Sequence, residues 1–320
     1  MRFNSDQIQK IGKEISSKVD GKTLFDEFSR GRYSTDASVY QIKPLGVVLP
    51  KDTNDVLSLM EYSQKNSVPL LARGGGSSQC GQTVGESVVL DYSKHQNKIL
   101  ELNVEEKYVW VQPGVVLDHL NAYLKPHGLW FPVDVSTSSR ATIGGMSANN
   151  SCGSRSLYYG NMVHNVLAIE AILDDGSIFN FDQINKNYLA TKNNQDRLYK
   201  IIDKFIDVRQ QVGGEIDANW PTTQRRVGGY NIDLIDPEGF NSSNLLVGSE
   251  GTLSLFNKIK LKLSEIPKNK ILGVCYFDNF HQAMELSKEI VKLKPTCVEL
   301  MDQNLLNLAK EIPMYAGGIK

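Results

Sequence analysis

A glycine-rich segment carries the densest chemical signal in the sequence. Residues 70–84, LLARGGGSSQCGQTV, place Arg73, three glycines and two serines directly after an apolar run. Glycine is unfavourable inside helices and strands, so three in a row indicate left-handed backbone or a close approach to a ligand. Successive N–H groups in such a loop form a nest for an anion, and Ser77 and Ser78 add hydroxyl donors. The segment predicts a diphosphate site, with a tight solvent turn as the alternative.

Two common nucleotide motifs fail in this segment on specific residues. A P-loop needs a lysine after its last glycine, whereas Gln82 follows Gly81. A dinucleotide fingerprint would use Gly74 and Gly76, but Gln79 occupies the third glycine position. The interpretation that remains is a diphosphate held by main-chain N–H and hydroxyl groups.

Two later segments could hold the rest of a cofactor. Residues 131–161 are rich in hydroxyls, amides and glycines and poor in charge, which suits a neutral heterocycle. A stretch this long without regular structure is uncommon unless it binds something, although a plain polar connection is the alternative. In residues 245–254, LLVGSEGTLS, Glu250 could accept from ribose hydroxyls or be a solvated turn acid.

Composition excludes several classes of protein. Among 320 residues, 41% are hydrophobic and 22% charged, which is ordinary for globular chains and enough for two domains. A net charge of −1 gives no basic field for nucleic acid, and no apolar stretch predicts a transmembrane segment or a secretory signal. The cysteines form no CxxC pair and the histidines no HExxH pattern, so we expect no metal site. Free thiols favour the cytoplasm.

The elements that must position these segments alternate between strands and helices. Residues 1–35 predict a short N-terminal helical arm, with Ile8, Ile11 and Ile15 at helical spacing. Strands are predicted over 46–50, 68–72, 87–92, 107–114 and 253–263, helices over 52–63, 116–124 and 198–208, and a hairpin at Asp175-Gly176. After a linker at 267–270, the pattern predicts strand, helix, strand and helix over 271–277, 280–294, 297–302 and 304–310. This last unit has no closing strand.

Seven motifs in order carry a family resemblance. They are RGGGSSQCGQ (73–82), QPGVVLDHLN (112–121), DVSTSSRATIGGMSANNSCG (134–153), LYYG (157–160), RRVGGYNID (225–233), VGSEGTL (247–253) and VELMD (298–302). Through them the chain resembles flavin-linked oxidoreductases of the vanillyl-alcohol oxidase / p-cresol methylhydroxylase (PCMH) type over residues 36–311. Within that family it is most similar to the N-terminal portion of D-2-hydroxyacid dehydrogenases acting on D-lactate, glycolate or D-2-hydroxyglutarate, especially long forms with an iron–sulfur domain.

The resemblance implies an α+β fold and an FAD site. A PCMH-type FAD-binding domain of two α+β subdomains would span 36–266, followed over 267–320 by the beginning of a ferredoxin-like cap domain that looks truncated. The implied cofactor-binding residues are Arg73, Gly74, Gly75, Gly76, Ser77 and Ser78 at the pyrophosphate, Gly81 and Gln82 after them, Pro132, Ser136, Thr142, Gly144, Gly145 and Asn150 along the flavin and ribityl phosphate, Gly153 and Gly160 shaping that pocket, and Glu250 toward the adenosine. No histidine precedes His95, so the family's histidine-linked flavin is absent and FAD would be non-covalent.

The implied activity is oxidation of a small D-2-hydroxy acid by hydride transfer to flavin. Electrons would pass to a quinone, a flavoprotein or an iron–sulfur domain, in the cytoplasm or at the inner-membrane surface. No catalytic base or metal ligand matches within this chain, so we assign none. Residues Arg225, Arg226, Tyr230 and Asn231 could face the substrate or form a structural loop. Alternatives are an FAD-binding fragment or electron-transfer subunit, and a flavin oxidase of the same fold acting on another alcohol or lactone.

Overall fold

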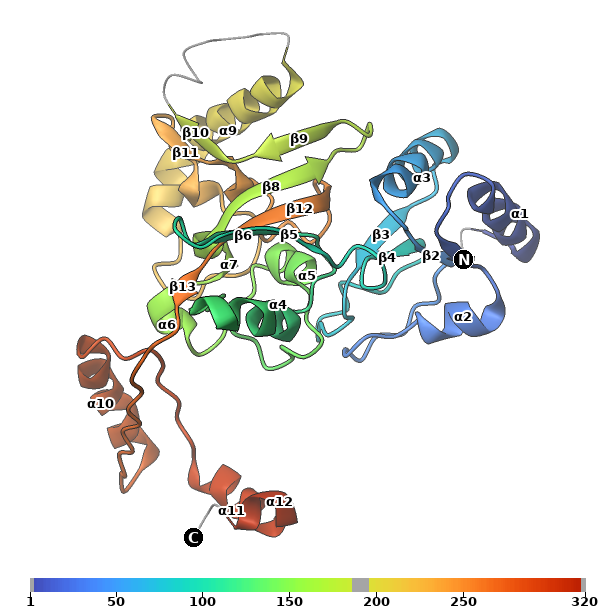
Figure 1. The fold of residues 1–320 in the computed structure, drawn as a ribbon. Helices are drawn as coiled ribbons and strands as arrows, with labels where there is room; N and C mark the ends of the chain where they lie inside the picture. The colour runs from blue at the N-terminus through green and yellow to red at the C-terminus, as the bar shows by residue number, and fades with distance from the viewer. Residues whose placement is uncertain (1–2, 186–195, 318–320) are drawn as a thin grey trace.

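The computed structural model describes residues 3–185 and 196–317, which form two α+β units and an extended C-terminal segment (Figure 1). The first unit contains a four-stranded sheet in the order β1-β2-β4-β3. Its elements are α1 (Ser5–Ser16), β1 (Lys22–Leu24), α2 (Glu27–Arg32), β2 (Gly46–Leu49), α3 (Thr53–Asn66), β3 (Leu70–Arg73) and β4 (Val88–Asp91). Strand β4 pairs in parallel with both β2 and β3, and its residues are all buried, as expected for an apolar run inside a parallel sheet.

The N-terminal helix is part of this unit's core. Asn4 caps α1 by accepting the N–H of Gln7 at 2.9 Å, and Ile8, Ile11 and Ile15 are buried in the cluster that contains the sheet residues. The predicted helix is therefore present, and it packs against the sheet. The predicted domain boundaries at residues 35 and 266 stay predictions.

The second unit is built on a five-stranded antiparallel sheet in the order β5-β6-β12-β8-β9. These strands are β5 (Ile99–Asn103), β6 (Tyr108–Val111), β8 (Val166–Ile172), β9 (Ile178–Phe181) and β12 (Leu255–Lys262). Strands β8 and β9 form the hairpin predicted at Asp175-Gly176, where Gly176 has a φ of 81°. The remaining elements of this unit are α4 (Leu117–Leu124), the 3-10 turn η1 (Lys125–His127), β7 (Leu129–Trp130), α5 (Ile143–Ala148), α6 (Ser156–Tyr159), α7 (Met162–Asn165), β10 (Gln183–Asn185), α9 (Arg197–Asn219), η2 (Ile232–Leu234), β11 (Gly239–Asn241), η3 (Ser242–Leu245) and β13 (Ser264–Glu265).

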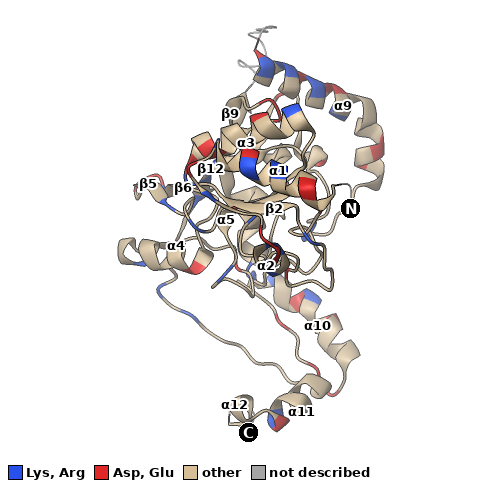
Figure 2. Cartoon of the chain, turned by 90° about the vertical axis from the view of Figure 1, so that its right-hand side faces the viewer, with Lys and Arg blue, Asp and Glu red and all other residues tan. Residues whose placement is uncertain are grey.

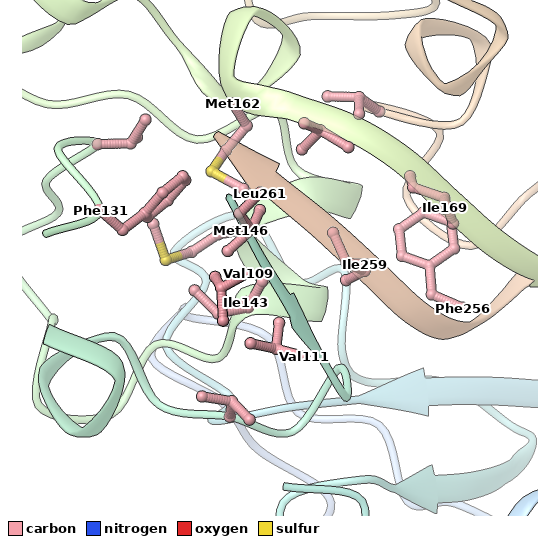
Figure 3. Packing of buried hydrophobic residues seen from close by; sticks show 14 of the residues in the cluster. Val109, Val111, Phe131, Ile143, Met146, Met162, Ile169, Phe256, Ile259 and Leu261 are labelled. Atoms are coloured by element: carbon pink, nitrogen blue, oxygen red, sulfur yellow. The ribbon is translucent and has the colours of Figure 1, made fainter. Parts of the chain in front are cut away.

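The core of the second unit holds the short helix α5 against the sheet. Figure 3 shows side chains of β6 and β12 close to Ile143 and Met146 of α5, namely Val109, Val111, Ile259 and Leu261, with Ile169 of β8 farther along the sheet. All of them are at most 2% exposed. Each fully buried aliphatic side chain contributes about 1.5–3 kcal/mol relative to exposure. This packing fixes the segment around residue 142 relative to the sheet.

The C-terminal segment differs from the sequence prediction. Helices α10 (Phe280–Lys292) and α11 (Gln303–Glu311) form, with α12 (Pro313–Ala316) after them, but the strands predicted over 271–277 and 297–302 are wrong. A strand needs a neighbouring strand for its main-chain groups, and the described residues supply none there. Ile271 is 98% exposed and Tyr276 91% exposed, and Figures 1 and 2 show the segment extending away from the two units.

Positive and negative side chains are mixed over the surface, as nearly equal numbers of the two in the sequence predict. Figure 2 shows Lys and Arg interspersed with Asp and Glu on α1, α3 and α9. Across the described ranges, no helix has the length and apolar character that crossing a bilayer requires. The same residues contain no group of three metal-binding side chains.

Candidate cofactor-binding site

A cleft of about 400 Å³ lies where the two units meet. It is lined by β3 and the glycine loop after it, by residues 135–152, and by residues 250–256 at the start of β12. All the predicted cofactor residues line it except Gly81, Pro132, Gly153 and Gly160. Three segments far apart in the sequence therefore meet at one site.

The glycine loop lies directly on the segment that begins α5. A Cβ at Gly74 would overlap the hydroxyl of Thr142, and one at Gly75 would overlap the main-chain carbonyl of Arg140. Thr142 in turn caps α5, accepting the N–H of Gly145 at 3.3 Å. The expected close approach therefore exists, but at these two glycines it is to the chain itself; Gly76, with a φ of 63°, has the expected left-handed backbone.

Arg73 anchors the base of the loop. Its guanidinium donates to the carbonyls of Thr35 at 2.8 Å, Thr83 at 3.2 Å and Tyr33 at 3.4 Å, and lies 5.2 Å from the centre of the Tyr33 ring. Burial lowers the pKa of Arg73, and the charge of Asp36 opposes that shift. The guanidinium thus holds residues 33–35 and Thr83 to the base of the glycine loop.

Replacing Arg73 with methionine is expected to lower the free energy of unfolding by about 3 kcal/mol. The reason is that three carbonyls lose a charged donor, while methionine keeps most of the apolar volume. Chemical denaturation of the purified chain measures the change. Arg140→Met is the matched control, because that exposed side chain has no partner among the described residues. Equal stability of Arg73→Met and the control would contradict the anchoring role.

A second contact joins the glycine loop to the 250–256 segment. The Gln82 side chain donates to the carboxylate of Glu250 at 3.0 Å, and the Ser78 hydroxyl bonds to the same Gln82 amide group. Glu250 has a φ of 50°, and its N–H donates to the Ala148 carbonyl at 3.0 Å. The carboxylate therefore sits at the exposed rim of the cleft, held between two of its walls.

The lining of the cleft suits a cofactor with both polar and apolar parts. Its walls combine main-chain N–H groups, hydroxyls and apolar side chains, and the buried hydroxyls of Tyr92 and Ser254 have no hydrogen-bond partner among the described residues. Apolar walls with a few main-chain N–H groups and hydroxyls are typical of cofactor sites.

Comparison with known proteins agrees with this geometry. Residues 44–182 match the family described as "FAD binding domain". The chain contains an FAD-binding domain.

The relatives of this FAD-binding domain are much longer proteins. The chain is 35% identical over 301 residues to D-2-hydroxyglutarate dehydrogenase of Escherichia coli (strain K12), covering 91% of this chain and 29% of the relative. It is 30% identical over 306 residues to glycolate oxidase subunit GlcD of Bacillus subtilis (strain 168), covering 93% of this chain and 55% of GlcD. The chain therefore spans less than a third of the first relative and about half of the second.

A solved structure shares the fold. Alkyldihydroxyacetonephosphate synthase superposes with a TM-score of 0.63 at 18% identity, covering 90% of this chain and 47% of the synthase. The predicted α+β, PCMH-type FAD-binding fold is confirmed, and so is FAD as the cofactor.

Four predicted residues lie outside the cleft for identifiable reasons. Gly153 is pressed against Asp134, whose carboxylate accepts the Arg155 N–H at 3.1 Å. Gly81, with a φ of 82°, lies against the Tyr40 ring, and Pro132 is buried. Gly160, with a φ of 76°, lies against His164 in a second cleft. Their neighbours shown here are protein atoms, and their part in FAD binding stays a prediction.

Sequence reasoning missed other lining residues. Tyr92 follows β4, and Ser254, Leu255 and Phe256 follow the VGSEGTL motif directly. For Tyr92 the signal that could have found it is position: a side chain just past the carboxyl end of a parallel strand points toward the same edge as its neighbours. Residues 254–256 stand at the start of the antiparallel strand β12, to which this rule does not apply.

The four predicted side chains of the RRVGGYN segment differ in their bonding partners. Asn231 donates to the Val247 carbonyl at 2.7 Å, Arg226 pairs with Asp233 at 2.7 Å, and the Tyr230 hydroxyl bonds to Thr252 at 2.8 Å. These contacts support the structural reading for three of the four predicted residues. Arg225 differs: among the described residues its guanidinium donates only to the Cys152 sulfur, at 3.2 and 3.3 Å. Cys152 lines the cleft of about 400 Å³ described above.

A second cleft of about 670 Å³ lies between α6, α7 and the end of α9 and contains His164. The Nδ1 atom of His164 accepts the Asn161 N–H at 3.0 Å. Although part of this side chain reaches solvent, enclosure of its ring lowers the pKa of His164, the charge of Arg226 lowers it further, and Asp233 opposes the shift.

Stability is therefore expected to fall slightly as the pH drops through 6.5, the ordinary pKa of histidine in the unfolded chain. In that range the unfolded state takes up a proton that the folded state does not, so the free energy of unfolding rises with pH. Replacing His164 with glutamine should flatten this part of the profile, measured by denaturation at several pH values. An identical slope in the wild type and in His164→Gln would contradict the prediction.

Proposed function

We propose that the chain is the FAD-binding portion of an oxidoreductase that oxidises a D-2-hydroxy acid of the lactate, glycolate or 2-hydroxyglutarate type. The observation that carries the proposal is identity spread over about nine-tenths of this chain with relatives named D-2-hydroxyglutarate dehydrogenase, including every segment of the cleft. FAD, when bound, accepts the hydride from the substrate carbon. Residues 36–266 would form the FAD-binding domain and residues 267–320 the start of the cap domain.

The chain's own contribution would be to hold the cofactor and orient the acid. FAD would be bound without a covalent link, with its diphosphate on the main-chain N–H groups of residues 74–78. Arg225 would bind the substrate carboxylate, because a guanidinium matches a carboxylate geometrically and this one has no acidic partner among the described residues. No residue of this chain is proposed as the base for the hydroxyl proton.

The setting of the reaction is also a proposal. Electrons would leave the flavin for a quinone, a flavoprotein or an iron–sulfur domain. We place the protein in the cytoplasm or at the inner-membrane surface, in keeping with four cysteines that form no disulfide.

One observation favours a second candidate. No residue of α10 or α11 is buried, and apolar side chains after residue 270 are exposed. This favours an FAD-binding fragment or electron-transfer subunit that turns over substrate only with further protein structure.

Anaerobic flavin bleaching tests the proposal. The FAD-loaded chain, and the same chain fused at residue 266 to the C-terminal remainder of the E. coli relative, would be mixed with D-2-hydroxyglutarate, D-lactate or glycolate. Loss of flavin absorbance in either protein supports hydroxy-acid oxidation, and loss in the fusion alone supports the second candidate for the isolated chain. A yellow fusion that no D-2-hydroxy acid bleaches would refute the proposed activity. The L-enantiomers of lactate and 2-hydroxyglutarate serve as controls.

A further inference from the structure

The short helix α7 connects the second cleft to a wall of the first, the cleft of about 400 Å³. The first two N–H groups of α7 bond to residues that line the first cleft. Met162 donates to the Ser151 carbonyl at 3.1 Å, and Val163 donates to Oδ1 of the next wall residue, Asn150, at 3.0 Å. Asn150 is fully buried and has a φ of 48°, a left-handed conformation that a non-glycine residue keeps where its contacts hold it. The wall at residues 150–151 therefore depends on the start of α7.

The imidazole of His164 holds the start of α7. Its Nδ1 atom accepts the N–H of Asn161, the residue just before the helix, at 3.0 Å. A side chain at the third helical position that accepts this N–H forms half of a capping box. Asn161 is 2% exposed, and its side-chain amide donates to the Arg226 carbonyl at 3.5 Å. The same carbonyl accepts the side-chain amide of Asn150 at 3.4 Å. His164 is thus connected to the wall of the first cleft through α7 and through residue 226.

This contact requires a neutral imidazole. A ring nitrogen that accepts an N–H must carry a lone pair, so the ring proton lies on Nε2. Protonation of Nδ1 would set a second N–H against that of Asn161 and end the bond. Burial lowers the pKa of His164 from its ordinary value of 6.5, the charge of Arg226 lowers it further, and Asp233 opposes the shift. Since His164 is partly exposed in the second cleft, protons reach it from solvent.

The other charged and titratable groups around the ring are two ion pairs and two phenols. They are Arg226 with Asp233 at 2.7 Å, Arg209 with Asp217 at 2.9 Å, and the side chains of Tyr158 and Tyr159. Among the described residues that line this cleft, His164 is the one histidine. Histidine is the side chain whose ordinary pKa lies near neutrality, so a change in this region between about pH 5 and 7 is expected to come from His164.

We infer that His164 is a positioning residue for FAD binding: its neutral imidazole keeps residues 150 and 151 in the arrangement that FAD binds, and its protonation loosens them. Acidification must then weaken FAD binding, because the FAD-free protein takes up the proton more readily than the FAD-bound protein. This role rests on FAD occupying the first cleft. It is independent of which acid is oxidised.

Titration of the full chain with FAD at about pH 7.5 and about pH 5.5, followed by flavin fluorescence, tests this role without any turnover. The wild type is expected to bind FAD about fivefold more weakly at the lower pH, since one linked proton changes an affinity by at most about tenfold per pH unit. His164→Gln should bind FAD equally at both pH values and as tightly as the wild type at the higher one, because glutamine accepts the Asn161 N–H without titrating.

His164→Ala should bind FAD about fivefold more weakly than the wild type at the higher pH, since the Asn161 N–H then has no acceptor. Its affinity should not depend on pH. His119→Gln is the matched control and should keep the wild-type pH dependence, because this exposed residue of α4 lines neither cleft.

Reciprocity between proton and FAD gives a second measurement. If protons weaken FAD binding, bound FAD must lower the pKa of His164, which NMR of the imidazole protons in FAD-free and FAD-loaded protein measures. Equal pKa values of His164 in the two states would overturn the inference. So would equal FAD affinity of the wild type at the two pH values, the wild-type pH dependence in His164→Gln, a loss of affinity in His164→Gln as large as in His164→Ala, or wild-type affinity of His164→Ala at the higher pH.

Discussion

Replacing Gly75 with alanine is expected to weaken FAD binding by about a hundredfold. The new methyl group would overlap the main-chain carbonyl of Arg140, which cannot rotate away as a side chain would. The loop must then move away from the segment that begins α5, and overpacking of this kind costs about 1–3 kcal/mol. Since 1.4 kcal/mol corresponds to a factor of ten, displaced N–H groups and strained packing together give the expected loss.

The measurement is FAD titration of the purified variant by flavin fluorescence. Gly85→Ala is the matched control, because it lies just beyond the same loop and its new methyl group would be 3.6 Å from Leu71, an ordinary contact. Neither glycine has a positive φ, so the comparison isolates the steric effect from backbone strain. If Gly75→Ala bound FAD as tightly as Gly85→Ala, the loop would not depend on its contact with residue 140.

Much of the fold could be predicted because its signals are local. The apolar runs of β2 and β4 predict buried strands, and Asp175-Gly176 predicts the β8–β9 hairpin. Strand β5 was missed, since its half-exposed sequence ILELN shows no clear alternation. The helix predicted to end at Val208 continues to Asn219, because burial of Ile216 offsets the cost of Gly213 and Gly214.

The strands predicted after residue 270 depended on information that a local pattern does not contain. An apolar run such as ILGVCYF indicates what a segment would do beside a neighbour, but only the tertiary structure supplies the neighbour. The same run is exposed here, because none of the described residues packs over its apolar side chains. The helices α10 and α11 form nevertheless, since Asn279 and Asp302 cap them locally.

The candidate site was likewise predictable in its local segments but not in their long-range contacts. Its three segments were predicted from glycines and hydroxyls, which local composition reveals. The partner of each glycine was not predictable, because Gly74 and Gly153 contact residues far away in the sequence. Arg73 was expected at the pyrophosphate, whereas its guanidinium bonds to three main-chain carbonyls below the loop. A cationic side chain beside a glycine run is therefore compatible with support of the loop as well as with binding.

Replacing Arg225 with methionine is expected to reduce kcat/KM for a D-2-hydroxy acid by about a hundredfold. A carboxylate that loses a charged hydrogen-bond partner loses about 2–3 kcal/mol of binding. Because the contact is to the non-reacting end of the substrate, the loss should appear in binding and in positioning of the substrate carbon. Arg225→Lys should recover part of the affinity, since it keeps the charge without the planar fork.

Two measurements on the fused protein described above separate this role from a structural one. Flavin difference spectra would give the dissociation constant of the 2-oxo acid product, and anaerobic mixing would give the rate of flavin reduction by the 2-hydroxy acid. Arg32→Met, on the exposed end of α2 away from the cleft, is the matched control for loss of one positive charge. Within residues 3–185 and 196–317, the guanidinium of Arg225 donates only to a thiol, a weak acceptor that a carboxylate would displace. Unchanged product affinity in Arg225→Met would show that the acid is held elsewhere, whereas loss of FAD itself would place Arg225 in the cofactor's frame.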